Sequence, residues 1–135
     1  MRFGLLICVS LIAGCGAASS EPSKSGAEST ARVFHEALIT RDWPKAYAQL
    51  APETRRRISA DQFQQLAQFY RKQLEFEPTK VQVRSCEERD AEATAHITLL
   101  GTAVKQRFRD AVLLKQIDSE WRVVLPKNFG QATRK

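Results

Sequence analysis

Apolar residues change their spacing about halfway along the chain, from a helical repeat to a strand repeat. Before the change, a capping box formed by Ser59 and Gln62 predicts the start of a helix. Pro78 is expected to mark its end. Large apolar residues follow the capping box at intervals of three and four, which place them on one side of a helix: Phe63, Leu66, Ala67, Tyr70 and Leu74.

Two more helices are predicted upstream of this one. Ser25 and Glu28 have the spacing of a capping box, so the folded part is expected to begin near Ser25. Asp42 can cap a second helix with Pro44 in its first turn, and residues 53–58 fit one short extra turn. The first of these helices carries an apolar stripe made of Ala31, Phe34 and Leu38.

Downstream, apolar and polar residues alternate, which is typical of half-buried strands. The alternation predicts strands beginning at residue 81, over residues 93–99, over 104–115 and over 120–125, with a charged turn at 87–90. Because the helices precede the strands, the pattern predicts an α+β domain. We expect three N-terminal helices packed on a curved antiparallel sheet of about four strands, followed by a frayed basic tail over residues 127–135.

The first sixteen residues have a different character. Arg2 precedes an apolar run over residues 3–12, and small residues then lead to Cys15. This order is that of a secretory signal. The run is also too short to cross a bilayer, which takes about 20 residues. The ending Ile12, Ala13, Gly14 and Cys15 resembles the lipobox of bacterial lipoproteins.

In that family the cysteine receives lipid and the signal is cut just before it. The resemblance therefore implies a signal peptide over residues 1–14, a lipidated Cys15 and a bilayer as partner. Residues 15–27 lack large apolar side chains and are interpreted as a flexible tether spanning roughly 20 Å. Gly16 follows the cysteine where an aspartate often retains Gram-negative lipoproteins in the inner membrane. We therefore expect a lipid-anchored envelope protein, in the outer membrane facing the periplasm if the source is Gram-negative.

Charge and cysteine content narrow the function further. The 135 residues include 21 Lys and Arg against 15 Asp and Glu, a formal charge of +6. An exported, anchored protein rarely meets nucleic acid, so its basic surface is better suited to bind anionic lipid head groups or acidic envelope polymers. The alternative is that the basic side chains are simply solvated. Cys86 stands alone once Cys8 and Cys15 are assigned to the signal and the lipid, so no disulfide is expected within the domain.

Catalytic and metal-binding motifs are not evident. The two histidines, His35 and His96, have no partner at ligand spacing, and both are expected at the surface or at a pocket edge. No serine has the context of a nucleophile elbow, and no glycine-rich phosphate loop occurs. We therefore predict no catalytic residue, no metal and no cofactor.

Three segments together resemble the nuclear transport factor 2-like superfamily of cone-shaped α+β domains. They are residues 31–38, which look like its opening helix, residues 41–47, with the Asp-Trp and Ala-Tyr pairs of its lipoprotein-like members, and residues 113–123, which are similar to its closing hairpin. Arg41 and Ser119 replace the glycines usual in the last two. The resemblance covers residues 28–126 and implies a pocket between helices and sheet, and a potential dimer through the open sheet face.

The family includes enzymes and non-catalytic binding modules, so the fold alone does not settle the chemistry. Asp110 lies between Arg107 and Arg109, which favours ion pairing on a solvated strand face over a role as general base. In an enzyme, His96 or Asp110 would act with Tyr47 or Tyr70. Several residues are candidates for the pocket, although the aromatic ones fit a core equally well: Phe34, Tyr47, Tyr70, His96, Asp110 and Trp121.

These observations favour a non-catalytic envelope module that binds a small apolar ligand or a partner protein. One alternative is a homodimeric scaffold that buries the polar sheet face, with Thr94, His96 and Thr98 at the interface. The other, less favoured, is an isomerase or dehydratase that uses the pocket.

Overall fold

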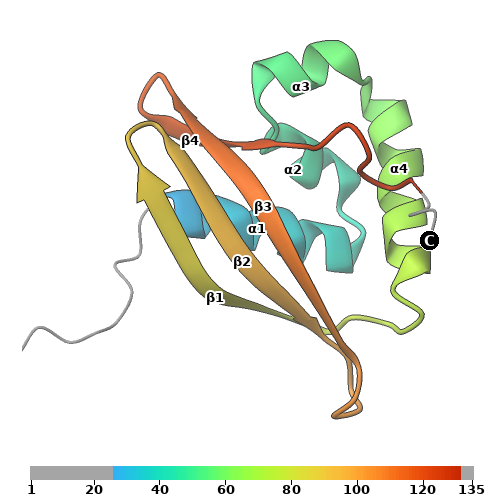
Figure 1. Cartoon of the computed structure of the whole chain (residues 1–135). Coiled ribbons are helices and arrows are strands. Elements are labelled where there is room, and N and C mark those ends of the chain that lie inside the picture. The colour runs from blue at the N-terminus through green and yellow to red at the C-terminus, as the bar shows by residue number, and fades with distance from the viewer. Residues whose placement is uncertain (1–25, 132–135) are drawn as a thin grey trace, which may run out of the picture.

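The computed structural model describes residues 26–131, in which helices precede a single sheet (Figure 1). This order confirms the predicted α+β class. A short fourth helix falls where one extra turn was expected. The elements are α1 (Gly26–Thr40), α2 (Trp43–Ala48), α3 (Pro52–Arg57), α4 (Ala60–Gln73), β1 (Lys80–Arg89), β2 (Glu92–Leu100), β3 (Arg107–Ile117) and β4 (Glu120–Val124).

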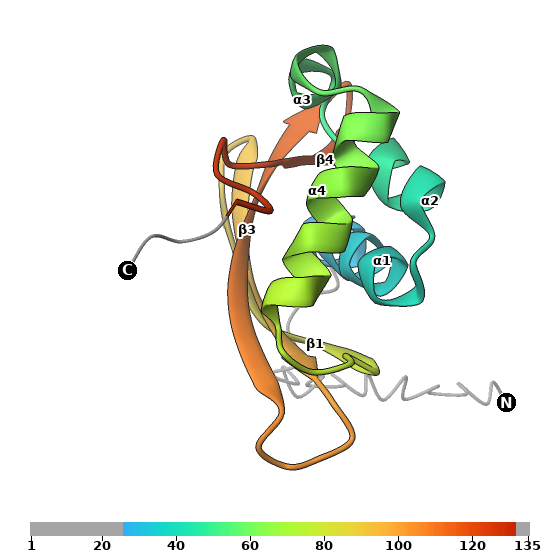
Figure 2. The same cartoon turned by 90° about the vertical axis from the view of Figure 1, so that its right-hand side faces the viewer.

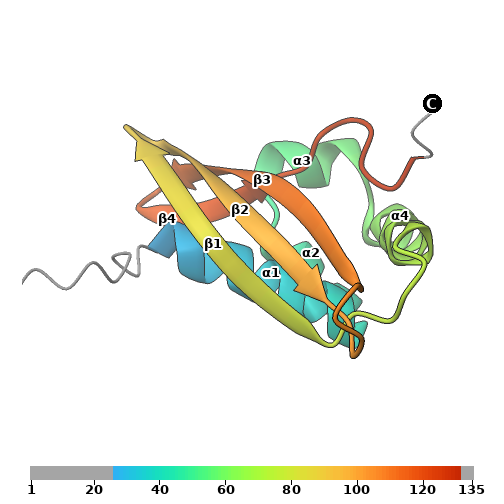
Figure 3. The same cartoon turned by 60° about the horizontal axis from the view of Figure 1, so that its bottom comes forward.

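The four strands form an antiparallel meander in the order β1-β2-β3-β4, with an irregularity in β1 between Val83 and Ser85. They lie side by side in Figure 3, with α1 packed on one face. Figure 2 shows the helices gathered on that same face of the sheet. Residues that alternate along a strand therefore point either toward the helices or toward the open face.

Two of the three predicted helix caps, Ser59 and Asp42, are present where the sequence placed them. The backbone N–H of Gln62 donates to Ser59 Oγ at 3.2 Å, and the Ser59 N–H donates back to Gln62 Oε1 at 2.9 Å. At α2, the Lys45 N–H donates to Asp42 Oδ1 at 3.3 Å, with Pro44 in the first turn. These bonds satisfy N–H groups that the helix itself leaves unpaired.

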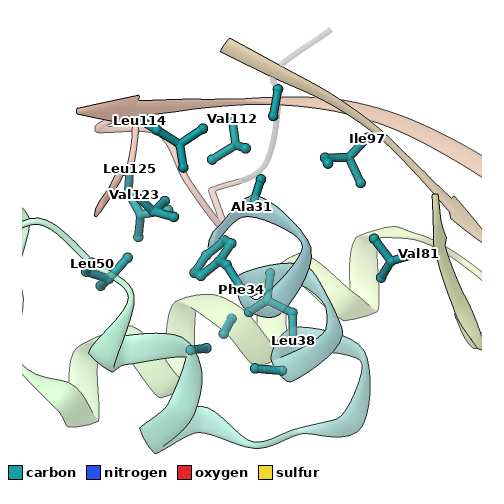
Figure 4. Close-up of a cluster of buried hydrophobic side chains, with 14 of the residues drawn as sticks. Ala31, Phe34, Leu38, Leu50, Val81, Ile97, Val112, Leu114, Val123 and Leu125 are labelled. Carbon is teal, nitrogen blue, oxygen red and sulfur yellow. The ribbon is translucent and has the colours of Figure 1, made fainter. Parts of the chain in front are cut away.

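The hydrophobic core lies between α1 and the inner face of the sheet (Figure 4). The stripe of α1 is buried as predicted, with Phe34 and Leu38 each 1% exposed. Ile97, Leu114 and Val123 from the sheet are fully buried against it. Burying one such side chain contributes about 1.5–3 kcal/mol, so this interface dominates the stability of the domain.

Several predicted boundaries differ from the structure. Residues 87–89 belong to β1, because they pair with the start of β2, and the turn is shorter than expected. Asp90 occupies this turn with φ of 56°. The strand predicted from residue 104 begins instead at Arg107, and α4 ends at Gln73, before the expected proline. Strand pairing and packing, rather than local composition, decide these ends.

The segment after β4 is packed rather than frayed as far as residue 131. Phe129 stacks on Tyr70, with ring centroids 5.1 Å apart, and on Phe63 at 6.2 Å. At the other end, α1 includes Gly26 and Ala27, which were assigned to the tether, and Ala27 is fully buried. The folded unit is thus slightly longer at both ends than residues 28–126.

The lipobox residues, Cys15 and most of the proposed tether lie outside the described residues. Ser25, the expected cap of the first helix, lies outside them as well. Within residues 26–131, no helix is both long and apolar enough to cross a membrane.

Candidate functional site

A cavity of about 500 Å³ lies between α1, α4, the middle of β3 and the segment that follows β4. Figure 1 shows this last segment crossing from β4 toward α4. Phe34 and His35 contribute from α1, and Tyr70 from α4. The remaining wall comes mainly from Phe108, Asp110 and Val112 of β3 and from Leu125, Phe129 and Gly130.

Three polar side chains from three elements meet at one side of the cavity. The Tyr70 hydroxyl donates a hydrogen bond to Asp110 Oδ2 at 2.8 Å. His35 Nε2 lies 3.8 Å from the same oxygen. The other ring nitrogen of His35 is 2.9 Å from the carbonyl oxygen of Ala31, one turn earlier in α1. The carbonyl can only accept, so it favours a proton on Nδ1 and orients the ring.

The environment changes the pKa values of two of these groups. Burial alone would raise the pKa of Asp110, but interactions with His35 and Tyr70 and the Ala111 N–H together lower it below its ordinary value. The pKa of Tyr70 is raised well above its ordinary value, first by burial and then by the neighbouring charge and hydrogen bond of Asp110. The pair is therefore a neutral phenol on an ionised carboxylate at neutral pH.

Aromatic rings form much of the rest of the wall. Tyr70 meets Phe108 edge to face, with centroids 6.0 Å apart and planes at 86°. Tyr70 also stacks on Phe129, with an angle of 23° between the two ring planes. Phe108 is 37% exposed, unusual for a phenylalanine, because its ring borders the open cavity. An apolar ligand with one polar group matches such a lining.

Three of the six predicted pocket residues line the cavity: Phe34, Tyr70 and Asp110. Phe34 also belongs to the hydrophobic core, so it is both a pocket residue and a core residue, the two roles expected for it. The other three residues, Tyr47, His96 and Trp121, lie elsewhere.

The three residues outside the cavity make contacts in other parts of the fold. Tyr47 donates to the carbonyl oxygen of Ile58 at 2.9 Å and so joins α2 to the chain before α4. Trp121 lies against Gly26 at the start of α1. His96 lies opposite Ala111 in the neighbouring strand. Both side chains point to the open face of the sheet, away from the helices and the cavity.

The environment of Asp110 differs from its predicted pairing with the flanking arginines. Adjacent strand residues point to opposite faces, so Arg107 and Arg109 face the open side while Asp110 faces the helices. Its partners are Tyr70 and His35. His35 is also no surface residue, since only 1% of it is exposed.

Sequence reasoning missed Phe108 and Phe129 as site residues. His35 was expected at the surface or at a pocket edge, and it lines the cavity, although it was not among the six pocket candidates. A signal existed for His35, which follows Phe34 and precedes Leu38 by three positions, so it borders the apolar stripe of its helix. No comparable local signal marks Phe129, which lies in a segment without regular structure. Across residues 26–131, no group of three or more His, Cys, Asp or Glu side chains is arranged to hold a metal ion.

Comparison with known proteins identifies the fold. The crystal structure of a Campylobacter jejuni protein, provisionally named a nuclear transport factor 2-like transpeptidase, matches with a TM-score of 0.63. The two chains are 16% identical, and the match covers 76% of this chain and 100% of that one. No protein-family model matches the sequence, and no curated protein matches it. The domain therefore has the nuclear transport factor 2-like fold expected from the three sequence segments.

Proposed function

We propose that this chain is a bacterial envelope lipoprotein, anchored through Cys15, whose folded domain binds a small ligand without transforming it. The observation that carries the binding role is the cavity, which combines apolar and aromatic walls with the Tyr70–Asp110 pair. About 500 Å³ lies within the range of small-molecule sites. The lipobox at residues 12–15 supports the anchor.

The chemistry of the cavity favours binding over catalysis. A general base works best with a pKa near the operating pH, whereas the pKa of Asp110 is lowered by its partners. A carboxylate that is already ionised and bonded to Tyr70 is a better receptor than a proton acceptor. The Tyr70–Asp110–His35 arrangement is nevertheless the feature that an isomerase or dehydratase would use, and this enzyme is the second candidate function.

The name of the Campylobacter jejuni protein raises transpeptidation as an activity to consider. Transfer of a peptide acyl group normally needs a serine or cysteine nucleophile activated by a base. None of the described residues that line the cavity is a serine, threonine, cysteine or lysine. The cavity therefore gives no support for extending that activity to this chain.

A homodimer through the open sheet face receives little support from its charges. Thr94 and His96 lie there beside Leu113, which is 40% exposed, but Arg109 and Lys115 occupy the same face of β3. Glu92 lies opposite Lys115 on that face and offsets its charge. A two-fold interface would still have to bury Arg109 beside its own patch, and a buried charge without a partner opposes association.

The anchor can be tested by labelling growing cells with palmitate. The wild-type chain should take up label, and Cys15→Ala should abolish it. Cys8→Ala is the matched control, because Cys8 leaves with the signal and its loss should keep the label. Equal labelling of the wild type and Cys15→Ala, or no label on either, would refute the anchor.

The binding role can be tested by native mass spectrometry of the full chain isolated from its own host's envelope. A bound ligand would appear as extra mass that is lost on denaturation. Phe108→Lys should abolish that mass, since it places a positive charge on the apolar wall of the cavity. Extra mass that persists in this variant would place the ligand elsewhere. The same spectrum reports the ratio of dimer to monomer.

A further inference from the structure

The charge of the cavity is opposite to that of the chain. The protein carries 21 Lys and Arg residues and a formal charge of +6. None of these basic residues is among the described residues that line the cavity, whereas Asp110 and Glu75 both line it. An anionic ligand would therefore meet the carboxylate of Asp110 with no lysine or arginine beside it, which costs binding free energy.

Asp110 retains the capacity to accept another hydrogen bond. Its Oδ2 accepts from Tyr70 at 2.8 Å, and its Oδ1 accepts from the Ala111 N–H at 2.8 Å. A carboxylate has about four acceptor positions, so these two bonds leave room for a donor from a ligand. The side chain is 31% exposed, at a cavity wall, and can be reached from the cavity.

His35 weakens but does not remove this negative character. When protonated, it offsets part of the charge of Asp110 from 3.8 Å away. Its own side chain is only 1% exposed, so it presents little positive surface to a ligand. Glu75 also lines the cavity, at an exposed position.

The aromatic wall favours the same kind of ligand. The faces of aromatic rings attract cations, particularly where water is partly excluded. Phe108 is 37% exposed and lies next to Asp110 at alternate strand positions, with Tyr70 in edge contact. A cation bonded to Asp110 can thus keep its carbon groups against aromatic and apolar surface.

We propose that the ligand of this cavity is an organic cation: a small molecule with an ammonium group at Asp110 and an apolar body against Phe108 and Leu125. This inference rests on the proposed binding function and specifies its ligand class. Charge and hydrogen bonding at Asp110 select the ammonium group, while the apolar wall holds the rest.

A charge series of similar probes tests the inference. Isothermal titration calorimetry of the full chain in a non-ionic detergent would compare 2-phenylethylammonium, which carries N–H donors, with neutral phenylacetamide and anionic phenylacetate. The cation should bind about tenfold more tightly than the amide, the size of effect that a desolvated cation–aromatic contact gives. The anion should bind least tightly.

Three variants separate the contributions. Asp110→Asn keeps the shape and an acceptor for Tyr70, and it should weaken the cation about tenfold while leaving the amide unchanged. Phe108→Leu keeps an apolar wall and should weaken the cation severalfold more than the amide. Asp61→Asn, an exposed carboxylate in α4 outside the cavity lining, is the matched control and should bind like the wild type.

The outcomes distinguish the cationic ligand class from the proposed binding role itself. Amide or anion binding as tight as the cation, with unchanged affinities in Asp110→Asn, would overturn the cationic ligand and keep the binding role. No binding of any of the three probes would count against both. Equal weakening by Asp61→Asn and Asp110→Asn would point to a general effect of surface charge and also overturn the proposal.

Discussion

The hydroxyl of Tyr70 is bonded to Asp110 at 2.8 Å, although 40 residues of sequence separate them. The bond joins α4 to β3 at one side of the cavity, so it ties the helix layer to the sheet there. It also couples the charge of the cavity to the stability of the fold, because the carboxylate form of Asp110 is the one that the native structure favours.

Acid should remove the stabilisation that Asp110 provides. Its pKa is lowered in the folded state, so its contribution is present above the unfolded value of about 3.9 and is lost as pH falls through the lower folded value. Asp110→Asn should therefore be less stable than the wild type at neutral pH, and the difference should shrink in acid. Urea unfolding midpoints measured from about pH 2 to about pH 7 would test this.

The control for that series is Asp61→Asn, an exposed position. It lies in the first turn of α4, so its loss should remove at most about 1 kcal/mol of helix-terminus stabilisation, and its pH profile should otherwise follow that of the wild type. A stability difference between Asp110→Asn and the wild type that stays constant across the whole range would contradict the linkage.

Arg71 should be needed to end α1. Its guanidinium is buried and donates to the carbonyl oxygens of Leu38 at 3.1 Å and Ile39 at 2.8 Å, and it also pairs with Glu77. These carbonyls lie in the last turn of α1, where a cation is favoured. Arg71→Met should lower the free energy of unfolding by about 2–3 kcal/mol, since it removes charged donors from buried acceptors.

Arg41→Met is the matched control for this prediction. Arg41 pairs with the same Glu77 at 3.7 Å, but its side chain is 64% exposed. Surface pairs contribute about 0–1 kcal/mol, so this variant should lose far less. Comparable losses in both variants would show that Glu77, and not the helix carbonyls, makes Arg71 important.

Gly130 should be required for the segment after β4 to close the cavity. It has φ of +68°, and a Cβ atom there would lie 2.3 Å from the carbonyl oxygen of Leu66. Gly130→Ala should cost about 1–3 kcal/mol or detach the segment. Lys127 is already at the surface, and detachment would free its backbone to enter the active site of trypsin, so the rate of cleavage there is the direct measurement.

Asn128→Ala, at an exposed position of the same segment, should leave that cleavage rate unchanged. A rate in Gly130→Ala equal to the wild-type rate, with unchanged stability, would mean that the segment accommodates a side chain by shifting.

The capping box of α4 should be worth a measurable amount of stability. Ser59→Ala removes the oxygen that accepts from Gln62 N–H, and it should lower the free energy of unfolding by about 1 kcal/mol. Ser29→Ala, exposed within α1, should instead be neutral or slightly stabilising, because alanine is the better helix former. Chemical unfolding of both variants checks the prediction, and equal effects would contradict the capping role.

The spacing of apolar and capping residues a few positions apart was sufficient to predict the helices and strands of this fold. The stripe of α1, the capping box of α4 and the alternation in β2 each depend on residues a few positions apart, so the sequence alone predicted helices followed by an antiparallel sheet. The ends of β1 and β3 were less predictable, because the partner strand supplies the hydrogen bonds that decide where a strand stops.

The site depended on tertiary structure. Along the sequence, Arg107 and Arg109 are the charged neighbours of Asp110, but the alternation of a strand turns them to the open face. Folding instead brings His35 and Tyr70 to Asp110 from two helices. The sequence by itself determined the helices and the strands, since these follow from neighbouring residues, and the anchor at Cys15 stays a prediction from sequence. Only the packing of α1 and α4 on the sheet decided which polar side chains share the cavity, because those contacts join residues that are distant in the chain.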